Sequence, residues 1–219
     1  MPESTRFVRQ VHGVVVVRGE SLDRSGAVEA DAITSSTPGL PVGVVTADCV
    51  PILIAREDGT RVAAVHAGWR GLAAGIIEAA LMAMASPAAA LRVAVGPAAR
   101  ACCYEVDAPV VRALEARHRG LLPDVLGASR PGHHRLDLAE LAVRVLARAG
   151  VAPDRIGTAH RLCTICAPGP RFESYRRDGP AAGRLRHFIA PALDGPVPGR
   201  GAPREGRAPG GPVPTGNRR

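Results

Sequence analysis

The chain contains several apolar runs separated by short polar stretches that hold glycine or proline. Runs of roughly four to eight residues rich in valine, isoleucine and alanine, bounded by such turn signals, are typical of buried β-strands. Four consecutive valines lie in the first run, and the turn signal Glu57-Asp58-Gly59 separates two later ones. The pattern predicts strands at residues 7–18, 40–46, 51–56, 61–66, 91–95, 155–160 and 184–189.

Three further segments are predicted to be helical. The segment GLAAGIIEAALMAMA has a helical composition and stops at a Ser-Pro pair, so a helix is predicted at residues 69–85. A second helix is predicted at residues 108–118. Asp137 is followed three residues later by Glu140, as in a capping box, so a third helix is predicted from there to residue 150.

The order of these elements indicates the fold class. Strands outnumber helices, and the two do not alternate steadily along the chain. We therefore expect a mixed α/β (α+β) layered domain. With 46% hydrophobic residues among 219, a single domain over residues 1–190 can bury a core. Since aromatic residues make up only 3%, that core must consist of valine, alanine, leucine and isoleucine.

The last part of the chain, residues 191–219, is rich in proline, glycine and arginine and lacks an apolar period, which predicts a disordered tail. The tail holds five arginines against Asp194 and Glu205, so it supplies three of the eight net positive charges. The chain has no lysine. Neither a clustered basic face nor stacking aromatic side chains accompany the charge, which argues against a nucleic-acid partner.

The compartment is indicated by what the sequence lacks. No apolar run approaches the roughly 20 residues that cross a bilayer. The first ten residues are polar and contain no signal-peptide apolar region. A cytoplasmic protein without a membrane partner is expected. In such a chain the five cysteines are expected to be thiols rather than disulfides; they are Cys49, Cys102, Cys103, Cys163 and Cys166.

Candidate metal-binding residues lie near the ends of predicted strands. His12, Cys49 and His66 each occupy such a position, and strand ends that are distant in sequence can converge in an α/β core. Imidazole and thiolate are the ligands that zinc favours, and three protein ligands leave a position open for catalysis. The alternative is a set of core histidines and a small buried cysteine. Residue spacing does not choose between these interpretations.

Six motifs are similar, in order, to the motif series of the YfiH/LACC1 family. They are RQVHG, TADCVPIL, AAVHAGWRG, VGPA with CCYEV, HRLDL, and LCT with FESYRRDG and GR, spread over residues 9–189. That family was long labelled polyphenol oxidase or laccase domain and is now described as purine nucleoside phosphorylase. The resemblance implies a CNF1/YfiH-like layered sandwich of mixed β-sheets flanked by helices.

The resemblance also implies roles for particular residues. The family's zinc ligands correspond to His12, Cys49 and His66, and Asp48 is expected to orient a ligand or transfer a proton. The implied activities are phosphorolysis of adenosine, inosine and methylthioadenosine, and deamination of adenosine. Zinc lowers the pKa of water toward 7, which suits deamination. Phosphate binding suits arginine, and the candidates are Arg70, Arg176 and Arg177, with solvated or salt-bridged arginines as the alternative.

The other cysteines have simpler interpretations. Cys163 and Cys166 form a Cys-x-x-Cys pair, which can be redox-active or bind zinc. The resemblance covers Cys163 but does not require Cys166, which favours ordinary thiols. Cys102 and Cys103 either line the pocket or pack in the core, and packing is favoured.

The sequence departs from the family pattern at its start. Family members usually have a further stretch before the first motif, with an Arg-Gly-Gly-Val-Ser type motif and a Leu-Asn-Leu segment. Here His12 is almost at the start. The expectation is a misassigned start or a truncated protein with impaired activity.

Three alternative functions are considered. A multicopper laccase commonly uses His-x-His pairs, and none occurs among the seven histidines; copper is therefore a less favoured cofactor than zinc. A cysteine hydrolase pairing Cys49 with His66 would also accommodate the editing of peptidoglycan precursors. A degraded family member that only binds ligands would fit the missing N-terminal stretch.

Overall fold

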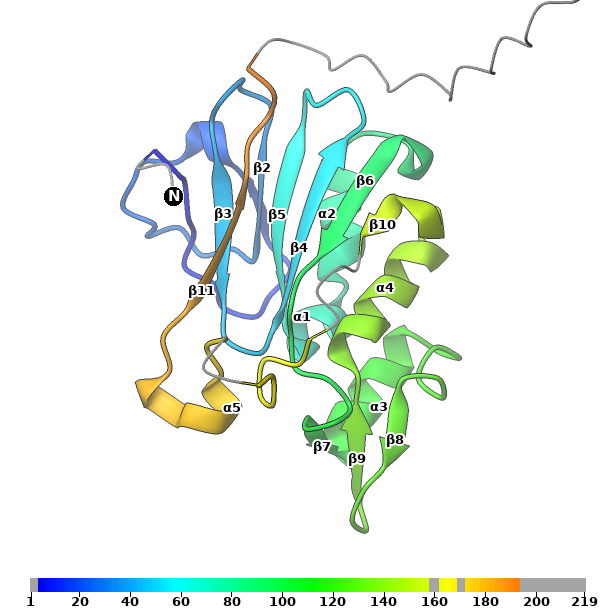
Figure 1. Cartoon of the computed structure of the whole chain (residues 1–219). Coiled ribbons are helices and arrows are strands. Elements are labelled where there is room, and N and C mark those ends of the chain that lie inside the picture. The colour runs from blue at the N-terminus through cyan, green and yellow to red at the C-terminus, as the bar shows by residue number, and fades with distance from the viewer. Residues whose placement is uncertain (1–3, 158–161, 169–171, 194–219) are drawn as a thin grey trace, which may run out of the picture.

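A six-stranded mixed sheet forms the centre of the protein (Figure 1). The computed structural model describes residues 4–157, 162–168 and 172–193. The strand order is β1-β2-β5-β4-β6-β10, with parallel pairing at the two outer pairs and antiparallel pairing between. The strands are β1 (Val16–Arg18), β2 (Ala32–Ser35), β4 (Val50–Arg56), β5 (Val62–Ala67), β6 (Leu91–Val95) and β10 (Ile156–Gly157).

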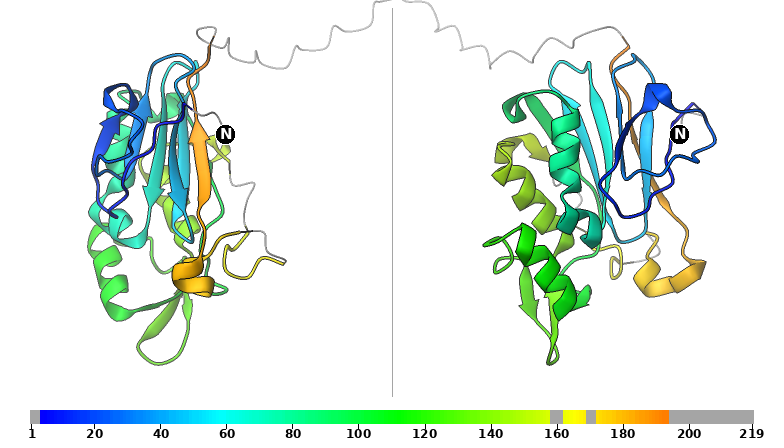
Figure 2. Two further views of the ribbon diagram at one scale, coloured as in Figure 1. Left: turned by 90° about the vertical axis from the view of Figure 1, so that its left-hand side faces the viewer. Right: turned by 180° about the vertical axis from the view of Figure 1, so that it is seen from behind.

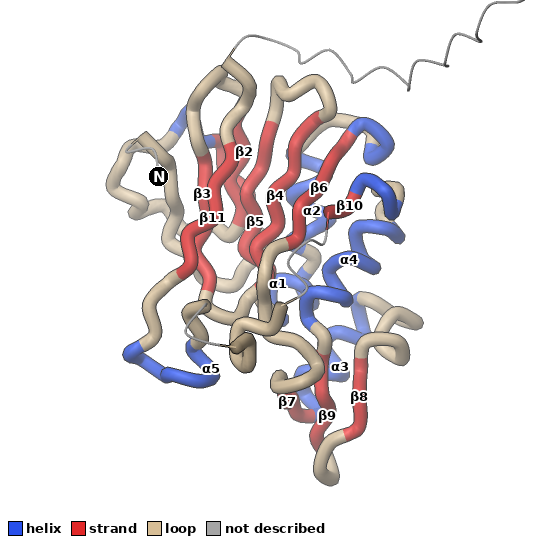
Figure 3. Tube along the Cα trace, viewed as in Figure 1, coloured by secondary structure: helices blue, strands red, loops and turns tan. Residues whose placement is uncertain are grey.

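Two smaller antiparallel sheets complete the β structure. Strand β3 (Val42–Thr46) pairs with β11 (Leu185–Ile189). The second sheet has the order β7-β9-β8 and lies beside α3 (Figure 3), with β7 at Glu105–Asp107, β8 at Leu126–Ala128 and β9 at His133–Leu136. The helices are α1 (Trp69–Ala74), α2 (Ile76–Ala83), α3 (Ala108–Arg117), α4 (Leu138–Arg148) and α5 (Tyr175–Asp178).

The central sheet is covered on both faces. Viewed edge-on in the left part of Figure 2, α2 and α3 lie on one side, and the orange strand β11 lies on the other with α5 below it. Along β5, Val65 and Ala67 belong to the core beneath the helices, whereas Val62 and Ala64 belong to a second core beneath β3. A strand that is buried on both faces is apolar at nearly every position, which is why 61–66 reads as a continuous run. The predicted layered mixed fold is confirmed.

Several predicted elements differ from the structure in extent. The helix predicted at 69–85 is two helices, because Gly75 adopts φ 98°, a left-handed conformation that ends α1. A side chain at Gly75 would also meet the Arg117 guanidinium. Most of the strand predicted at 7–18 is irregular chain, with single β-bridges at Arg6 and Arg9 before β1 begins.

Five short elements of the structure were not predicted from the sequence. They are β2, the three strands of the small sheet, and α5, which has four residues. The strand predicted at 155–160 is present at Ile156–Gly157, and residues 158–160 lie outside the described residues. From residue 194 onward the predicted tail also lies outside them; at its start, the Pro191 carbonyl accepts a hydrogen bond from Gly39. Among the described residues, no helix has the length and apolar character needed to cross a membrane.

Candidate active site and metal centre

Three side chains that are distant in sequence meet at one end of the central sheet. His66 lies in β5 and is buried, Cys49 lies in the link between β3 and β4, and His12 lies in the loop that leads to β1. Their possible ligand atoms all lie within 4.8 Å of one another. The Cys49 Sγ is 3.8 Å from the His12 Nε2. The structure therefore brings together the three residues predicted to bind a metal.

The backbone is strained at one of these residues and directly before another. His12 has φ 62° and Asp48, which precedes Cys49, has φ 90°. Non-glycine residues in such conformations cost on the order of 1–3 kcal/mol each and occur preferentially at functional sites. Both strained residues lie at the donor cluster. The strained backbone there sets the directions in which the side chains point.

Asp31 fixes the donor cluster and was not singled out in the sequence. Its side chain is fully buried, and one carboxylate oxygen is 2.8 Å from the Nδ1 of His66. It also accepts hydrogen bonds from the backbone N–H groups of His12 at 2.9 Å and Gly13 at 2.6 Å. A carboxylate at Nδ1 holds the proton on that nitrogen and leaves Nε2 as the lone-pair donor, the arrangement common around metal-binding histidines.

The charge state of Asp31 follows from these contacts. Burial alone raises its pKa, but the hydrogen bonds from His66, Gly13 and His12 outweigh burial and place the pKa below its ordinary value. Asp31 is therefore a carboxylate. Its sequence signal was a single acid between alanines at the start of an apolar run, which indicates a buried charge but names no partner.

Two of the donors, His12 and Cys49, are uncharged in the absence of a cation. Burial lowers the pKa of His12, and the neighbouring His66 and Arg70 act in the same direction. Burial raises the pKa of the Cys49 thiol to about 12, and the carboxylates of Asp48 and Asp31 add to the rise. A reactive cysteine nucleophile needs a lowered pKa. A metal ion, in contrast, deprotonates a coordinating thiol outright.

Gly68 leaves room for the cluster. A Cβ atom at this position would lie 2.8 Å from the Cδ2 of His12 and 3.0 Å from the Sγ of Cys49. The two imidazoles and the thiol form the donor set of a three-ligand catalytic zinc site with one position open. The residues present therefore fit a zinc ion.

The side chains of Asp48 and Arg177 form hydrogen bonds with residues outside the donor cluster. The two carboxylate oxygens of Asp48 accept hydrogen bonds from the Thr164 hydroxyl and the backbone N–H of Arg176, each at 2.7 Å. The Arg177 guanidinium donates to the carbonyls of Thr164 at 3.0 Å and Phe172 at 2.9 Å and pairs with its neighbour Asp178. Asp48 therefore holds the start of α5, and Arg177 holds the preceding loop.

Arg176 lines an aromatic pocket of about 350 Å³, and Arg70 stacks on Trp69, one of the aromatic side chains of that pocket. The Arg176 guanidinium lies 4.9 Å above the ring of Tyr104, and that of Arg70 lies 4.4 Å from the ring of Trp69. Both rings line the pocket. Burial raises the pKa of Tyr104 to about 12. The pocket is connected to the donor cluster through Arg176, whose backbone N–H binds Asp48, the neighbour of Cys49.

Known proteins resemble this chain over most of its length. It matches, over residues 1–192, a family described as multi-copper polyphenol oxidoreductase laccase. A Xylella fastidiosa protein named purine nucleoside phosphorylase is 41% identical over 182 residues, which are 81% of this chain and 69% of that protein.

Solved structures give the same result. A Neisseria meningitidis protein has a TM-score of 0.76 and 34% identity, covering 86% of this chain and 75% of its own. The Bacillus licheniformis protein YfiH has a TM-score of 0.78 and 29% identity, covering 85% and 74%. The resemblance found in the sequence is confirmed, and the chain belongs to the YfiH family.

Proposed function

We propose that this chain is a zinc-dependent purine nucleoside phosphorylase that acts on adenosine, inosine and methylthioadenosine and also deaminates adenosine, with residues 1–190 as its catalytic unit. The observation that carries the proposal is the cluster of His12, Cys49 and His66 beside an aromatic pocket with arginines. The name of the Xylella fastidiosa relative supports the reaction class.

His12, Cys49 and His66 would hold the zinc ion. When bound, zinc supplies a Lewis acid that polarises an oxygen of the substrate or of water. Asp31 keeps the proton of His66 on Nδ1, so that Nε2 remains available as a donor. Gly68 keeps the space between His12 and Cys49 free of side-chain atoms.

The pocket offers contacts for both parts of the reaction. The aromatic side chains of Trp69 and Tyr104 suit a planar purine. Arg176, which lines the pocket, and Arg70, which stacks on Trp69, suit the phosphate. In phosphorolysis, a phosphate oxygen attacks C1′ of the ribose, the bond from C1′ to the base breaks, and the base leaves with the electron pair and takes up a proton. Arginines placed at the pocket would hold the phosphate for this attack.

Asp48 acts as a positioning residue in this proposal. Its carboxylate binds the backbone N–H of Arg176, and the side chain of Arg176 lies over Tyr104. Asp48 thus connects the link that carries Cys49 with the arginine at the pocket.

Product analysis tests the proposal. The purified full-length protein should form ribose 1-phosphate from inosine only when phosphate is present, and it should release ammonia from adenosine. Nucleoside cleavage that does not depend on phosphate would contradict phosphorolysis. A zinc-loaded protein that turns over no nucleoside would contradict the enzyme assignment and favour a binding protein.

The cysteine-hydrolase alternative is less well supported. It requires Cys49 to be a thiolate without a metal, whereas burial and two carboxylates raise its pKa. Phenol oxidation distinguishes the copper oxidase from the zinc enzyme. The zinc-loaded protein should oxidise phenols negligibly, since zinc has no redox chemistry.

A further inference from the structure

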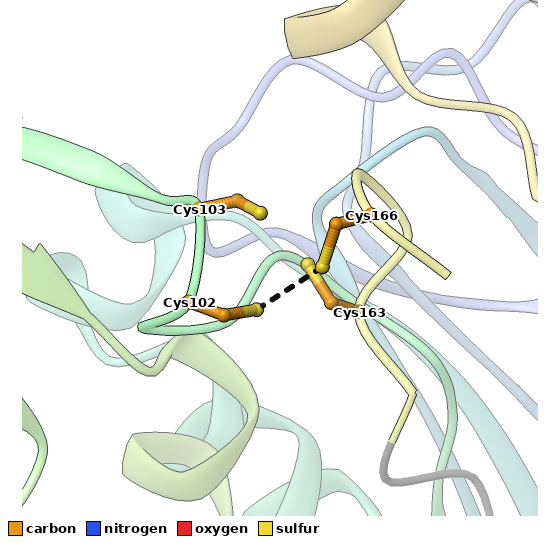
Figure 4. Close-up of side chains that lie close together, drawn as sticks. All are labelled: Cys102, Cys103, Cys163 and Cys166. Carbon is orange, nitrogen blue, oxygen red and sulfur yellow. Dashed lines mark hydrogen bonds between the residues drawn. The ribbon is translucent and has the colours of Figure 1, made fainter. Parts of the chain in front are cut away.

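Four cysteines from two separate loops meet beside Thr164, the residue that binds Asp48. Cys102 and Cys103 lie in the turn that follows β6, and Cys163 and Cys166 lie in the segment that follows β10. In Figure 4 the side chains from the two segments point toward one another. Their four sulfur atoms all lie within 4.8 Å of one another, and those of Cys102 and Cys166 are 3.4 Å apart.

These separations fit one tetrahedral ion. With zinc–sulfur bonds of about 2.3 Å, four thiolates at the corners of a tetrahedron lie about 3.8 Å from one another. This value lies between the 3.4 Å that separates the sulfurs of Cys102 and Cys166 and the upper limit of 4.8 Å for all pairs. Small side-chain rotations would therefore place all four sulfurs around a single ion.

Cys163 and Cys166 lie in a tight turn. The Ala167 N–H donates to the Cys163 carbonyl at 3.1 Å, and the two cysteines are separated by two residues, as in a Cys-x-x-Cys loop. Such turns present both sulfurs to one ion in structural zinc sites.

The two loops are already joined by the backbone. Ala98 forms a β-bridge with Cys163, and the Thr164 N–H donates to the Ala98 carbonyl at 3.1 Å. The Arg135 guanidinium donates to the Cys103 carbonyl at 2.9 Å. The four sulfurs are therefore held near one another by contacts that need no metal.

We propose that Cys102, Cys103, Cys163 and Cys166 bind one zinc ion as a structural site, separate from the site of His12, Cys49 and His66. The ion ties the turn after β6 to the segment after β10. Its neighbours reach the active site: Thr164 donates to Asp48, and Tyr104 lines the pocket. The inference concerns metal binding and stands whether or not the protein cleaves nucleosides.

Metal counting on full-length protein, prepared with a reductant and without oxygen, tests the proposal. Wild type should hold about two zinc ions per chain, one at each site. Cys102→Ser with Cys166→Ser should lose about one, and Cys49→Ser, the matched control at the other site, should lose the other. Cobalt-loaded Cys49→Ser should show the strong thiolate-to-cobalt charge-transfer band of a four-sulfur site, which remains measurable even if the double variant does not fold.

Four results would overturn the proposal. The first is a double variant with the wild-type zinc content. The second is cobalt-loaded Cys49→Ser without a thiolate charge-transfer band. The third is a wild type, isolated without oxygen and without reductant, in which fewer than all five cysteines react as thiols after unfolding in chelator, since that would indicate a disulfide such as Cys102–Cys166. A visible iron chromophore in place of zinc would also contradict the assigned metal.

Discussion

Asp31 links the backbone of the first loop to the imidazole of β5. One of its carboxylate oxygens faces His66 and the backbone N–H of His12, and the other faces the N–H of Gly13. All of these are donors, so only a group with two acceptor oxygens satisfies them. The loop that carries His12 and the orientation of His66 therefore depend on the same side chain.

Asp31→Asn should weaken zinc binding at the His12 site about 10- to 100-fold. An asparagine amide would place N–H groups against an N–H donor of Gly13 or His66, which leaves a buried mismatch costing about 1–3 kcal/mol of stability. Competition with a chromophoric chelator measures the affinity, and thermal unfolding measures the stability. Unchanged zinc affinity in a folded variant would show that Asp31 has no part in positioning the ligands.

Zinc affinity at this site should rise with pH. Burial raises the pKa of Cys49 to about 12, so the thiol is protonated at neutral pH and must lose its proton on binding. The pKa of His12 is lowered, so its imidazole is already neutral. Between about pH 7.5 and 9 the affinity should therefore increase about tenfold per pH unit, with release of about one proton.

The Cys102→Ser and Cys166→Ser double variant is suited to this titration, because only the His12 site then binds. Calorimetry in buffers of different ionisation enthalpy counts the released protons. A pH-independent affinity would mean that Cys49 is not a ligand.

The three residues of the donor cluster could be named from the sequence because each lies in a recognisable motif. Asp31 could not, since a lone buried acid acquires its meaning only when β2 pairs with β5 and brings it to His66. Asp48 and Arg177 lie in motifs as well, but a motif does not show which way a side chain points. Their hydrogen bonds to Thr164 and Phe172 became evident only from the structure.

Helix α5 shows how a short helix is held by contacts with its neighbours. It has four residues and begins at Ser174, whose side chain accepts a hydrogen bond from the Arg177 N–H. Asp48 binds the helix from the link before β4. A helix this short is not stable alone, so its position depends on these contacts.

The two arginines of α5 should respond differently to substitution. Arg176→Ala should raise the KM for phosphate about tenfold or more, because a charged partner at the pocket is lost. Arg177→Ala should chiefly lower the melting temperature, because its guanidinium holds the carbonyls of Thr164 and Phe172. Arg92→Ala, an exposed arginine paired with Glu57, is the matched control. Steady-state kinetics with varied phosphate and thermal unfolding separate the effects; an equal KM for phosphate in all three variants would remove Arg176 from the phosphate site.

Elements with a strong local pattern were predictable, and elements formed by tertiary pairing were not. The runs of β4 and β5 are apolar because both faces of the sheet are covered there, whereas β6 alternates between buried and exposed residues. In contrast, β9 begins with two histidines, and it is a strand because it pairs with β7 and β8. The apolar composition of 69–85 hid the break at Gly75, since a glycine within a helical pattern ends the helix only when the backbone turns left-handed.

The candidate functional groups of the whole molecule lie at one end of the central sheet. The donor cluster, the aromatic pocket and the four cysteines involve the loops around β4, β5 and β6 together with the segment before α5. Thr164 joins them, because it lies beside Cys163 and donates to Asp48, the neighbour of Cys49. The layered cores fix the strands, and the loops at this end carry the functional groups, as is usual for sites on rigid scaffolds.

Zinc content and ribose 1-phosphate formation, measured on the same samples, test the central claim that His12, Cys49 and His66 hold a zinc ion needed for phosphorolysis. Cys49→Ser and His66→Ala should each hold about one zinc ion fewer per chain than wild type and form no ribose 1-phosphate from inosine. His134→Ala, a histidine outside both donor clusters, should keep the wild-type zinc content. Wild-type zinc content in Cys49→Ser and His66→Ala would contradict the claim.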